Sequence, residues 1–142
     1  MDYGEVLREA QEKGYAESDP TADVGGLDAA RKLVILASIA FNTRISLDDV
    51  LVSGIESLKL CDIEYAKELG YTIKLLAVAK HDEEKGITVC VRPTMLPTEH
   101  PLAGVNDVFN AVFVEGDALG EAMFMGRGAG GLPTASAVCG DI

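Results

Sequence analysis

Apolar residues in the first half of the chain recur at the spacing of helices. Their spacing over residues 3–10 predicts an amphipathic helix, and Asp62–Leu69 predicts a shorter one that ends at Gly70. Between them, Leu27–Phe41 contains no helix-breaking residue and carries no charge after Lys32. A helix without a polar face needs cover on most of its surface. We therefore expect Leu27–Phe41 to form a largely buried helix.

The second half of the chain has the short β-branched and aromatic runs that are typical of strands. Turn signals such as Glu84-Lys85-Gly86 and Gly116-Asp117 separate these runs. The predicted strands are Thr72–Ala79, Ile87–Arg92, Val108–Val114 and Glu121–Met125, and Val50–Ile55 is a further candidate. Since no repeat or linker interrupts the chain, we predict one α+β domain over residues 1–142, with a mixed β-sheet of at least four strands packed against helices, one of them largely buried.

Acidic residues outnumber basic ones, with 23 Asp and Glu against 12 Lys and Arg and a net charge of −11. The resulting field repels nucleic-acid phosphates and anionic membrane surfaces, so we expect neither as a partner. Cys61, Cys90 and Cys139 form no Cys-x-x-Cys pair, which argues against a disulfide framework and a zinc site. The longest apolar run, Leu33–Phe41, is too short to span a bilayer. We expect a soluble cytoplasmic protein.

The chain has a carboxylate-rich segment just before the long apolar helix. Tyr15–Gly26 is predicted to be a loop, because Asp19-Pro20 and Gly25-Gly26 interrupt regular structure. Such carboxylates could bind a divalent cation, which makes a metal-dependent hydrolase an alternative. However, Asp19–Asp23 lacks the spacing of a calcium loop, and no histidine lies nearby. We therefore expect no bound metal.

Asp28 and Lys32 are four residues apart and share one face of the predicted helix. The same stripe continues as Ile35, Leu36 and Ile39. This would place the pair at the boundary between the solvent-exposed surface and the hydrophobic core. A lysine in that position can exchange a proton beside a carboxylate partner, although most such pairs only stabilise a helix. The residues alone leave both interpretations open.

Two further features are candidates for ligand contact. Gly126–Gly131 follows a predicted strand and opens a helix, so bare backbone N–H groups could meet an anion there. A plain tight turn explains the glycines as well, because they do not form the dinucleotide-binding Gly-x-Gly-x-x-Gly unit. His81 and His100 fall in predicted turns without a partner cysteine, so we expect solvated histidines.

Taken together, four ordered motifs closely resemble homoserine dehydrogenase. They are Gly14–Asp23, Gly26–Lys32, Val108–Asp117 and Gly126–Ala135, and the similarity covers essentially the whole chain. The resemblance implies an oxidoreductase that interconverts homoserine and aspartate 4-semialdehyde with NAD or NADP. That reaction belongs to the biosynthesis of threonine, methionine and isoleucine.

The resemblance also implies roles for individual residues. Lys32 would be the catalytic acid and base, Glu17 and Asp28 would bind the amino acid substrate, and Asp23 would support them. Gly128 and Gly130 would lie against the cofactor. This set is Lys32 as catalytic residue, Glu17, Asp23 and Asp28 as substrate-binding residues, and Gly128 and Gly130 as cofactor-binding residues.

The resemblance further implies a homodimer formed through the β-rich half. The chain lacks the family's N-terminal nucleotide-binding unit, so residues 1–142 are interpreted as the catalytic domain of a longer enzyme that does not turn over alone. The alternative is a non-catalytic amino-acid-binding or dimerisation module with the same fold.

Overall fold

The computed structural model describes residues 3–12, 19–128 and 131–142. The contacts within it divide the chain into two compact units, Met1–Met95 and Leu96–Ile142. The interpretation of 1–142 as one domain stays a prediction.

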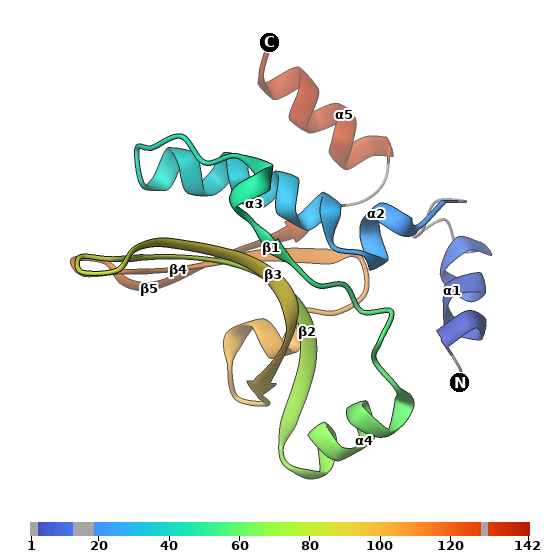
Figure 1. The fold of residues 1–142 in the computed structure, drawn as a ribbon. Coiled ribbons are helices and arrows are strands. Elements are labelled where there is room, and N and C mark those ends of the chain that lie inside the picture. The colour runs from blue at the N-terminus through green and yellow to red at the C-terminus, as the bar shows by residue number, and fades with distance from the viewer. Residues whose placement is uncertain (1–2, 13–18, 129–130) are drawn as a thin grey trace. The chain divides into compact units, whose positions relative to one another are not determined.

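The first unit combines helices with a three-stranded sheet (Figure 1). Strand β1 pairs with β3 in parallel, with Val52 opposite Val91, and β3 also pairs with β2. Because a turn of only three residues joins β2 to β3, those two strands run antiparallel and the sheet is mixed. The elements are α1 (Tyr3–Glu12), α2 (Thr21–Val24), α3 (Leu27–Ala40), η1 (Leu47–Asp49), β1 (Leu51–Val52), α4 (Leu60–Glu68), β2 (Tyr71–Asp82) and β3 (Gly86–Pro97).

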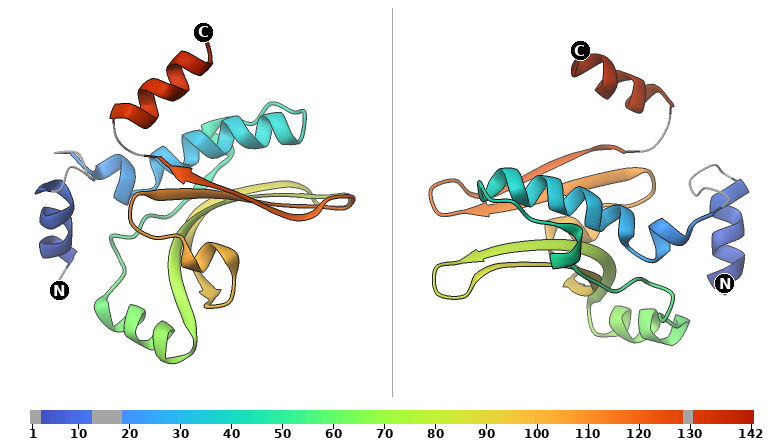
Figure 2. Two further views of the ribbon diagram at one scale, coloured as in Figure 1. Left: turned by 180° about the vertical axis from the view of Figure 1, so that it is seen from behind. Right: turned by 45° about the horizontal axis from the view of Figure 1, so that its top comes forward.

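Helix α3 packs along the three-stranded sheet, and both views of Figure 2 show it on the same side of the β2–β3 hairpin. The hydrophobic core lies in this layer. Val91 and Ala30 are fully buried, and Ala37 is 2% exposed. The remaining members of the core cluster are Leu33, Ile45, Val50 and Val89. The small side chains at 30 and 37 bring the helix backbone close to the strands.

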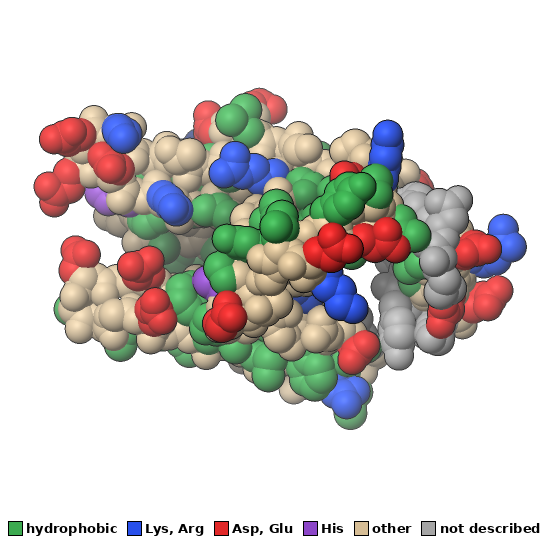
Figure 3. Space-filling view, turned by 90° about the horizontal axis from the view of Figure 1, so that it is seen from below, with side chains coloured by type: hydrophobic (Ala, Val, Ile, Leu, Met, Phe, Trp, Pro, Cys, Tyr) green, Lys and Arg blue, Asp and Glu red, His purple; other side chains and the backbone are tan. Residues whose placement is uncertain are grey.

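The prediction of a helix over Leu27–Phe41 is confirmed, but its burial on nearly every side is wrong. Only one stripe of α3 is buried, whereas Ile35 is 61%, Leu36 50% and Ile39 75% exposed. A charge-free sequence does not reveal which of its faces packs, because apolar residues occur on all of them. Figure 3 shows the face seen from below, where other apolar side chains are exposed among charged ones.

The second unit is built on a β-hairpin. Strands β4 (Phe109–Gly116) and β5 (Gly120–Arg127) pair antiparallel, with Gly116 opposite Gly120. A 3-10 helix η2 (Pro101–Gly104) precedes the hairpin, and α5 (Gly131–Gly140) follows it.

The α+β class is therefore confirmed, but a single sheet of at least four strands is wrong. The described strands form a three-stranded and a two-stranded sheet, because only main-chain pairing decides which strands share a sheet. The strands predicted in the second half of the chain are present, and β2 and β3 extend well beyond their apolar runs. Of the candidate Val50–Ile55, only Leu51–Val52 forms a strand.

Three local predictions also need correction. The predicted loop Tyr15–Gly26 contains the short helix α2, and α4 begins at Leu60 because the Asp62 carboxylate accepts the Lys59 N–H at 2.9 Å. His100 is half-buried rather than solvated. Its Nδ1 accepts the Leu102 N–H at 3.1 Å, which caps η2. Within the described ranges, no helix combines the length and apolar character that crossing a membrane requires.

The buried Val91 gives a test of the core. Replacing Val91 with alanine removes two methyl groups from a fully buried site, so we expect the free energy of unfolding to fall by about 2 kcal/mol. The matched control is Leu51→Ala in the neighbouring strand, where the side chain is 75% exposed and we expect little change. Urea unfolding of both variants measures the difference. Equal losses would contradict the core described above.

Candidate functional site

A pair of glycines joins α2 to α3 and fixes where α3 begins. Gly26 is buried and has a φ of +82°, a left-handed conformation that glycine adopts without strain. A Cβ at this position would lie 3.0 Å from Cγ1 of Val91 and 3.3 Å from Cγ1 of Val52. The Gly26 carbonyl accepts the Ala30 N–H at 3.0 Å, the first hydrogen bond of α3. The start of the helix is thus held directly on strands β1 and β3.

The first turns of α3 carry the predicted catalytic pair. Lys32 Nζ and Asp28 Oδ2 are 2.6 Å apart, one helical turn from each other. The Lys32 side chain is 67% exposed and that of Asp28 43%. An ion pair this exposed contributes at most about 1 kcal/mol to stability. The Lys32 ammonium is open to contact with a small molecule.

The predicted setting of this pair is wrong, although the pairing itself is confirmed. The stripe that continues from the pair as Ile35, Leu36 and Ile39 is the exposed face of α3. The buried stripe is the one that contains Ala30 and Ala37. The pair therefore does not lie at the edge of a dry core within the described part of the chain, because the helix packs through its small residues.

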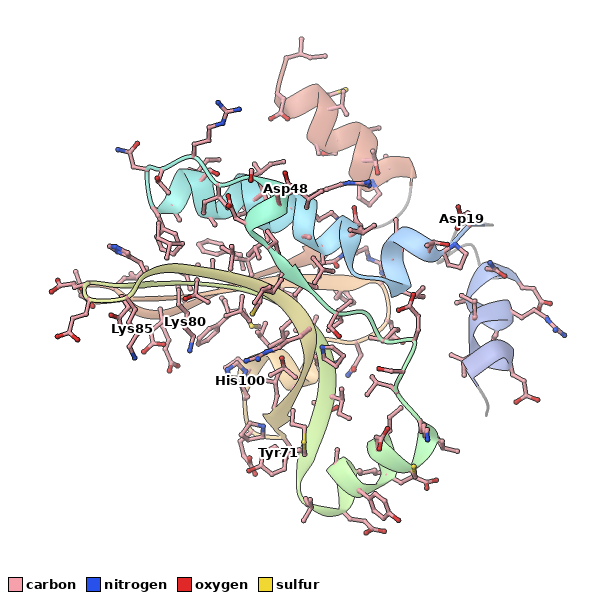
Figure 4. All side chains as sticks on the ribbon, viewed as in Figure 1. Asp19, Asp48, Tyr71, Lys80, Lys85 and His100 are labelled. Atoms are coloured by element: carbon pink, nitrogen blue, oxygen red, sulfur yellow. The ribbon has the colours of Figure 1, made fainter. Side chains whose placement is uncertain are left out.

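The acidic residues before α3 are only partly brought together. Asp19 accepts two hydrogen bonds from Thr21, from its hydroxyl at 2.6 Å and its N–H at 3.1 Å, and these lower the pKa of the Asp19 carboxyl. Figure 4 shows Asp19 just ahead of α2. Asp23 is exposed on α2, and its backbone carbonyl accepts the Gly26 N–H at 3.1 Å. Glu17, the other predicted substrate ligand, lies outside the described residues.

Metal-ligating side chains do not gather in the part of the chain that the structure describes. No group of three or more His, Cys, Asp or Glu residues there has the arrangement that could hold an ion.

The glycine-rich segment after β5 lies beside a polar side chain. A Cβ on Gly128 would overlap the Asn110 side chain, so the absence of a side chain at 128 lets the Asn110 amide approach the backbone. Gly128 also donates its N–H to the Val108 carbonyl at 3.2 Å. Gly130, the second predicted cofactor contact, lies outside the described residues.

An open hollow of about 310 Å³ lies on the β4–β5 hairpin next to Gly128. The Arg127 guanidinium stands over the Phe109 ring, 5.6 Å from its centroid. Gly126 faces Asn110 across the two strands, and no atom of the described residues lies within 4 Å of where a Cβ on Gly126 would be. The hollow is lined by Asn110, Ala111, Val112, Phe124, Met125, Gly126, Arg127 and Gly128.

Sequence reasoning missed Asn110 and Arg127 as neighbours of the glycines. The signal was present, because Asn110 stands in one of the motifs that carry the resemblance and Arg127 lies between two glycines. Only the strand register shows that Asn110 and Gly126 are opposite each other.

Comparison with known proteins places this arrangement in one family of oxidoreductases. The family model for homoserine dehydrogenase matches residues 1–142. The chain belongs to the homoserine dehydrogenase family.

Individual relatives agree over the whole chain. The chain is 56% identical to the homoserine dehydrogenase of Corynebacterium glutamicum and 54% identical to that of Bacillus subtilis, each over 99% of its length. The crystal structure of a homoserine dehydrogenase from Thiobacillus denitrificans superposes with a TM-score of 0.95 at 48% identity, over 99% of this chain and 32% of that one. A hyperthermophilic archaeal homoserine dehydrogenase, solved in complex with NADPH, has a TM-score of 0.75 at 29% identity, over 97% of this chain and 38% of that one.

The chain spans about a third of the length of the curated relatives that it matches, 33% for the first and 32% for the second.

The hydrogen bonds at Asp19 give a pH prediction. The lowered pKa means that Asp19 contributes stability above the unfolded-state value of about 3.9, and this contribution is lost as the pH falls through the lower folded-state pKa. Thr21→Val removes the hydroxyl donor, so we expect the Asp19 pKa to rise toward its ordinary value. Carboxyl-carbon NMR titration measures this shift. Asp49, which Ser46 holds in the same way, is the internal control, and an unchanged Asp19 titration would contradict the assignment.

Proposed function

We propose that this chain is the substrate-binding and catalytic part of an NAD(P)-dependent oxidoreductase that interconverts L-homoserine and L-aspartate 4-semialdehyde. This step serves the biosynthesis of threonine, methionine and isoleucine. The observation that best supports this proposal is the accessible Lys32–Asp28 pair on α3, in a chain that matches the family model over residues 1–142. We place the protein in the cytoplasm.

Lys32 supplies the acid and base of this reaction. Reduction of an aldehyde develops negative charge on the carbonyl oxygen, and that oxygen must gain a proton as the carbon gains a hydride. An ammonium group stabilises the developing charge and then donates the proton, and in the reverse direction the neutral amine removes the hydroxyl proton. The 2.6 Å contact with Asp28 favours one position of the Lys32 amine for this task.

Asp28, Asp23 and Glu17 recognise the amino acid end of the substrate. The α-ammonium of homoserine needs carboxylate acceptors, and charge-assisted hydrogen bonds to carboxylates are strong and directional. Asp28 is 43% exposed, so its carboxylate has room for a second cation beside Lys32. One carboxylate shared between the substrate ammonium and the catalytic lysine would set the distance between the binding end and the reacting end.

The cofactor is NAD or NADP, and it supplies or accepts the hydride when bound. The described residues suit one part of such a ligand. The bare backbone at Gly126 and the Arg127 guanidinium next to it favour contact with an anionic or planar group. We propose that Gly128 and Gly130 contact the cofactor.

The complete enzyme contains more than this chain. Because residues 1–142 span about a third of the length of the curated relatives, most of the cofactor site belongs to other parts of the enzyme. We also propose that the enzyme is a homodimer. Apolar side chains exposed on β4 and β5, with Phe124 68% and Met125 57% exposed, support a second copy as the partner.

The role of Lys32 predicts a large kinetic effect. In the full-length enzyme, we expect Lys32→Ala to lower kcat for homoserine oxidation by about 100- to 10,000-fold, since general acid and base groups contribute rate factors of that size. Stability should change little, because the ion pair is exposed. Initial rates of NADPH formation and thermal unfolding measure the two quantities.

Lys85→Ala is the matched control for Lys32→Ala. Lys85 is an exposed lysine in the β2–β3 turn, at the tip of the hairpin in Figure 4. We expect the Lys85→Ala substitution to leave kcat unchanged. A Lys32→Ala enzyme with the kcat of the wild type would remove Lys32 from the mechanism.

The proposed division of the enzyme predicts that residues 1–142 alone do not turn over. Without most of the cofactor site, the purified chain should form no NADPH from homoserine and NADP, although circular dichroism should show it folded. The full-length enzyme under the same conditions is the positive control. Homoserine-dependent NADPH formation by the isolated chain, free of contaminating enzyme, would refute this division.

A further inference from the structure

The loop that leaves β1 is packed against the α2–α3 junction backbone to backbone. Ile55 donates its N–H to the Val24 carbonyl at 2.9 Å, and Ser53 donates to the Val91 carbonyl at 2.8 Å. Gly54 lies between these two hydrogen bonds and is half-buried. The loop is thereby tied to the end of α2 on one side and to β3 on the other.

Gly54 has no room for any side chain. A Cβ at 54 would overlap the Val24 carbonyl oxygen and would lie 2.7 Å from the Gly25 Cα and 2.7 Å from Oε2 of Glu56. The Glu56 carboxylate could adopt another rotamer. The Val24 oxygen and the Gly25 Cα are backbone atoms, so they can move only together with the α2–α3 junction. The φ of Gly54 lies outside the left-handed region. Glycine is therefore needed here for the close approach of the two backbones and not for the backbone conformation.

A displaced junction would carry the catalytic pair with it. Gly25 ends α2, Gly26 begins α3, and Asp28 lies in the first turn of that helix. Lys32 follows one turn later and is bonded to Asp28. Because a helix moves as a rigid rod over two turns, a shift of its first residues changes the position of both functional groups.

We infer that Gly54 is a positioning residue of the active site, which sets the location of Asp28 and Lys32 through the contact with Val24 and Gly25. This inference rests on the proposed function for its kinetic consequence. The geometric part, that a side chain at 54 displaces the start of α3, stands independently of it.

The test compares two glycine substitutions in the full-length enzyme. We expect Gly54→Ala to lower kcat/KM for homoserine by about 10- to 100-fold through both a higher KM and a lower kcat, since small misplacements of reacting groups have effects of that size. The KM for NADP should stay within about twofold of the wild type, because the other parts of the enzyme hold most of the cofactor.

Gly70→Ala is the matched control. Gly70 follows α4 with a φ of +79°, and a Cβ there meets nothing within 4 Å. Alanine at 70 therefore strains the backbone and lowers the melting temperature without pushing on α3. If Gly54→Ala and Gly70→Ala have the same kinetic constants at a temperature where both are folded, the inference is overturned.

Amide hydrogen exchange gives a readout that needs no activity. The Ala30 N–H bonded to Gly26 should exchange faster in Gly54→Ala than in Gly70→Ala, and equal rates would overturn the geometric part. A wild-type enzyme that does not oxidise homoserine would refute the proposed function, and this exchange comparison would still decide the role of Gly54.

A milder variant serves if Gly54→Ala does not fold. Val52→Ala removes the Cγ1 methyl, which lies 3.3 Å from where a Cβ on Gly26 would be, from a side chain that is 36% exposed. It should speed exchange at Ala30 and raise the KM for homoserine in the same direction but by less. An unchanged exchange rate and an unchanged KM would overturn the inference.

Discussion

The structure of the first unit depends on how closely two backbones approach at the α2–α3 junction. Gly25, Gly26 and Gly54 carry no side chains, so the chain between the helices can lie directly on β1, β3 and the loop that follows β1. Hydrogen bonds from Ile55 to Val24 and from Ser53 to Val91 fix this approach. Because α3 starts at this point, the contact places both the core stripe of the helix and the Asp28–Lys32 ion pair.

The Asp28–Lys32 ion pair itself adds little to the stability of the fold. Lys32 and Asp28 are solvent-exposed, and an exposed ion pair gains little free energy because water screens it. The core is built on the other stripe of the helix, through Ala30, Leu33 and Ala37. The charged pair of α3 is thus separate from its packing residues, and it can be altered without removing buried contacts.

The hairpin of the second unit shows a similar use of glycine. Gly126 leaves an open hollow next to Asn110, whereas Gly128 allows the Asn110 amide to lie against the backbone. The sequence predicted a bare-backbone contact at these glycines, but the neighbour found at Gly128 is a side chain of the same chain. The register of β4 and β5 brings residues 110 and 126 together, and no local pattern encodes that pairing.

The sequence by itself determined the α+β class, the positions of the main helices and strands, and the pairing of Asp28 with Lys32, because periodicity and helical spacing are local properties. Its ordered motifs also determined the family. Only the tertiary structure decided that α3 buries its small residues and exposes Ile35 and Ile39, and that the strands divide between two sheets. Burial and strand pairing depend on residues that are far apart in the chain, so no reading of one segment alone could have settled them.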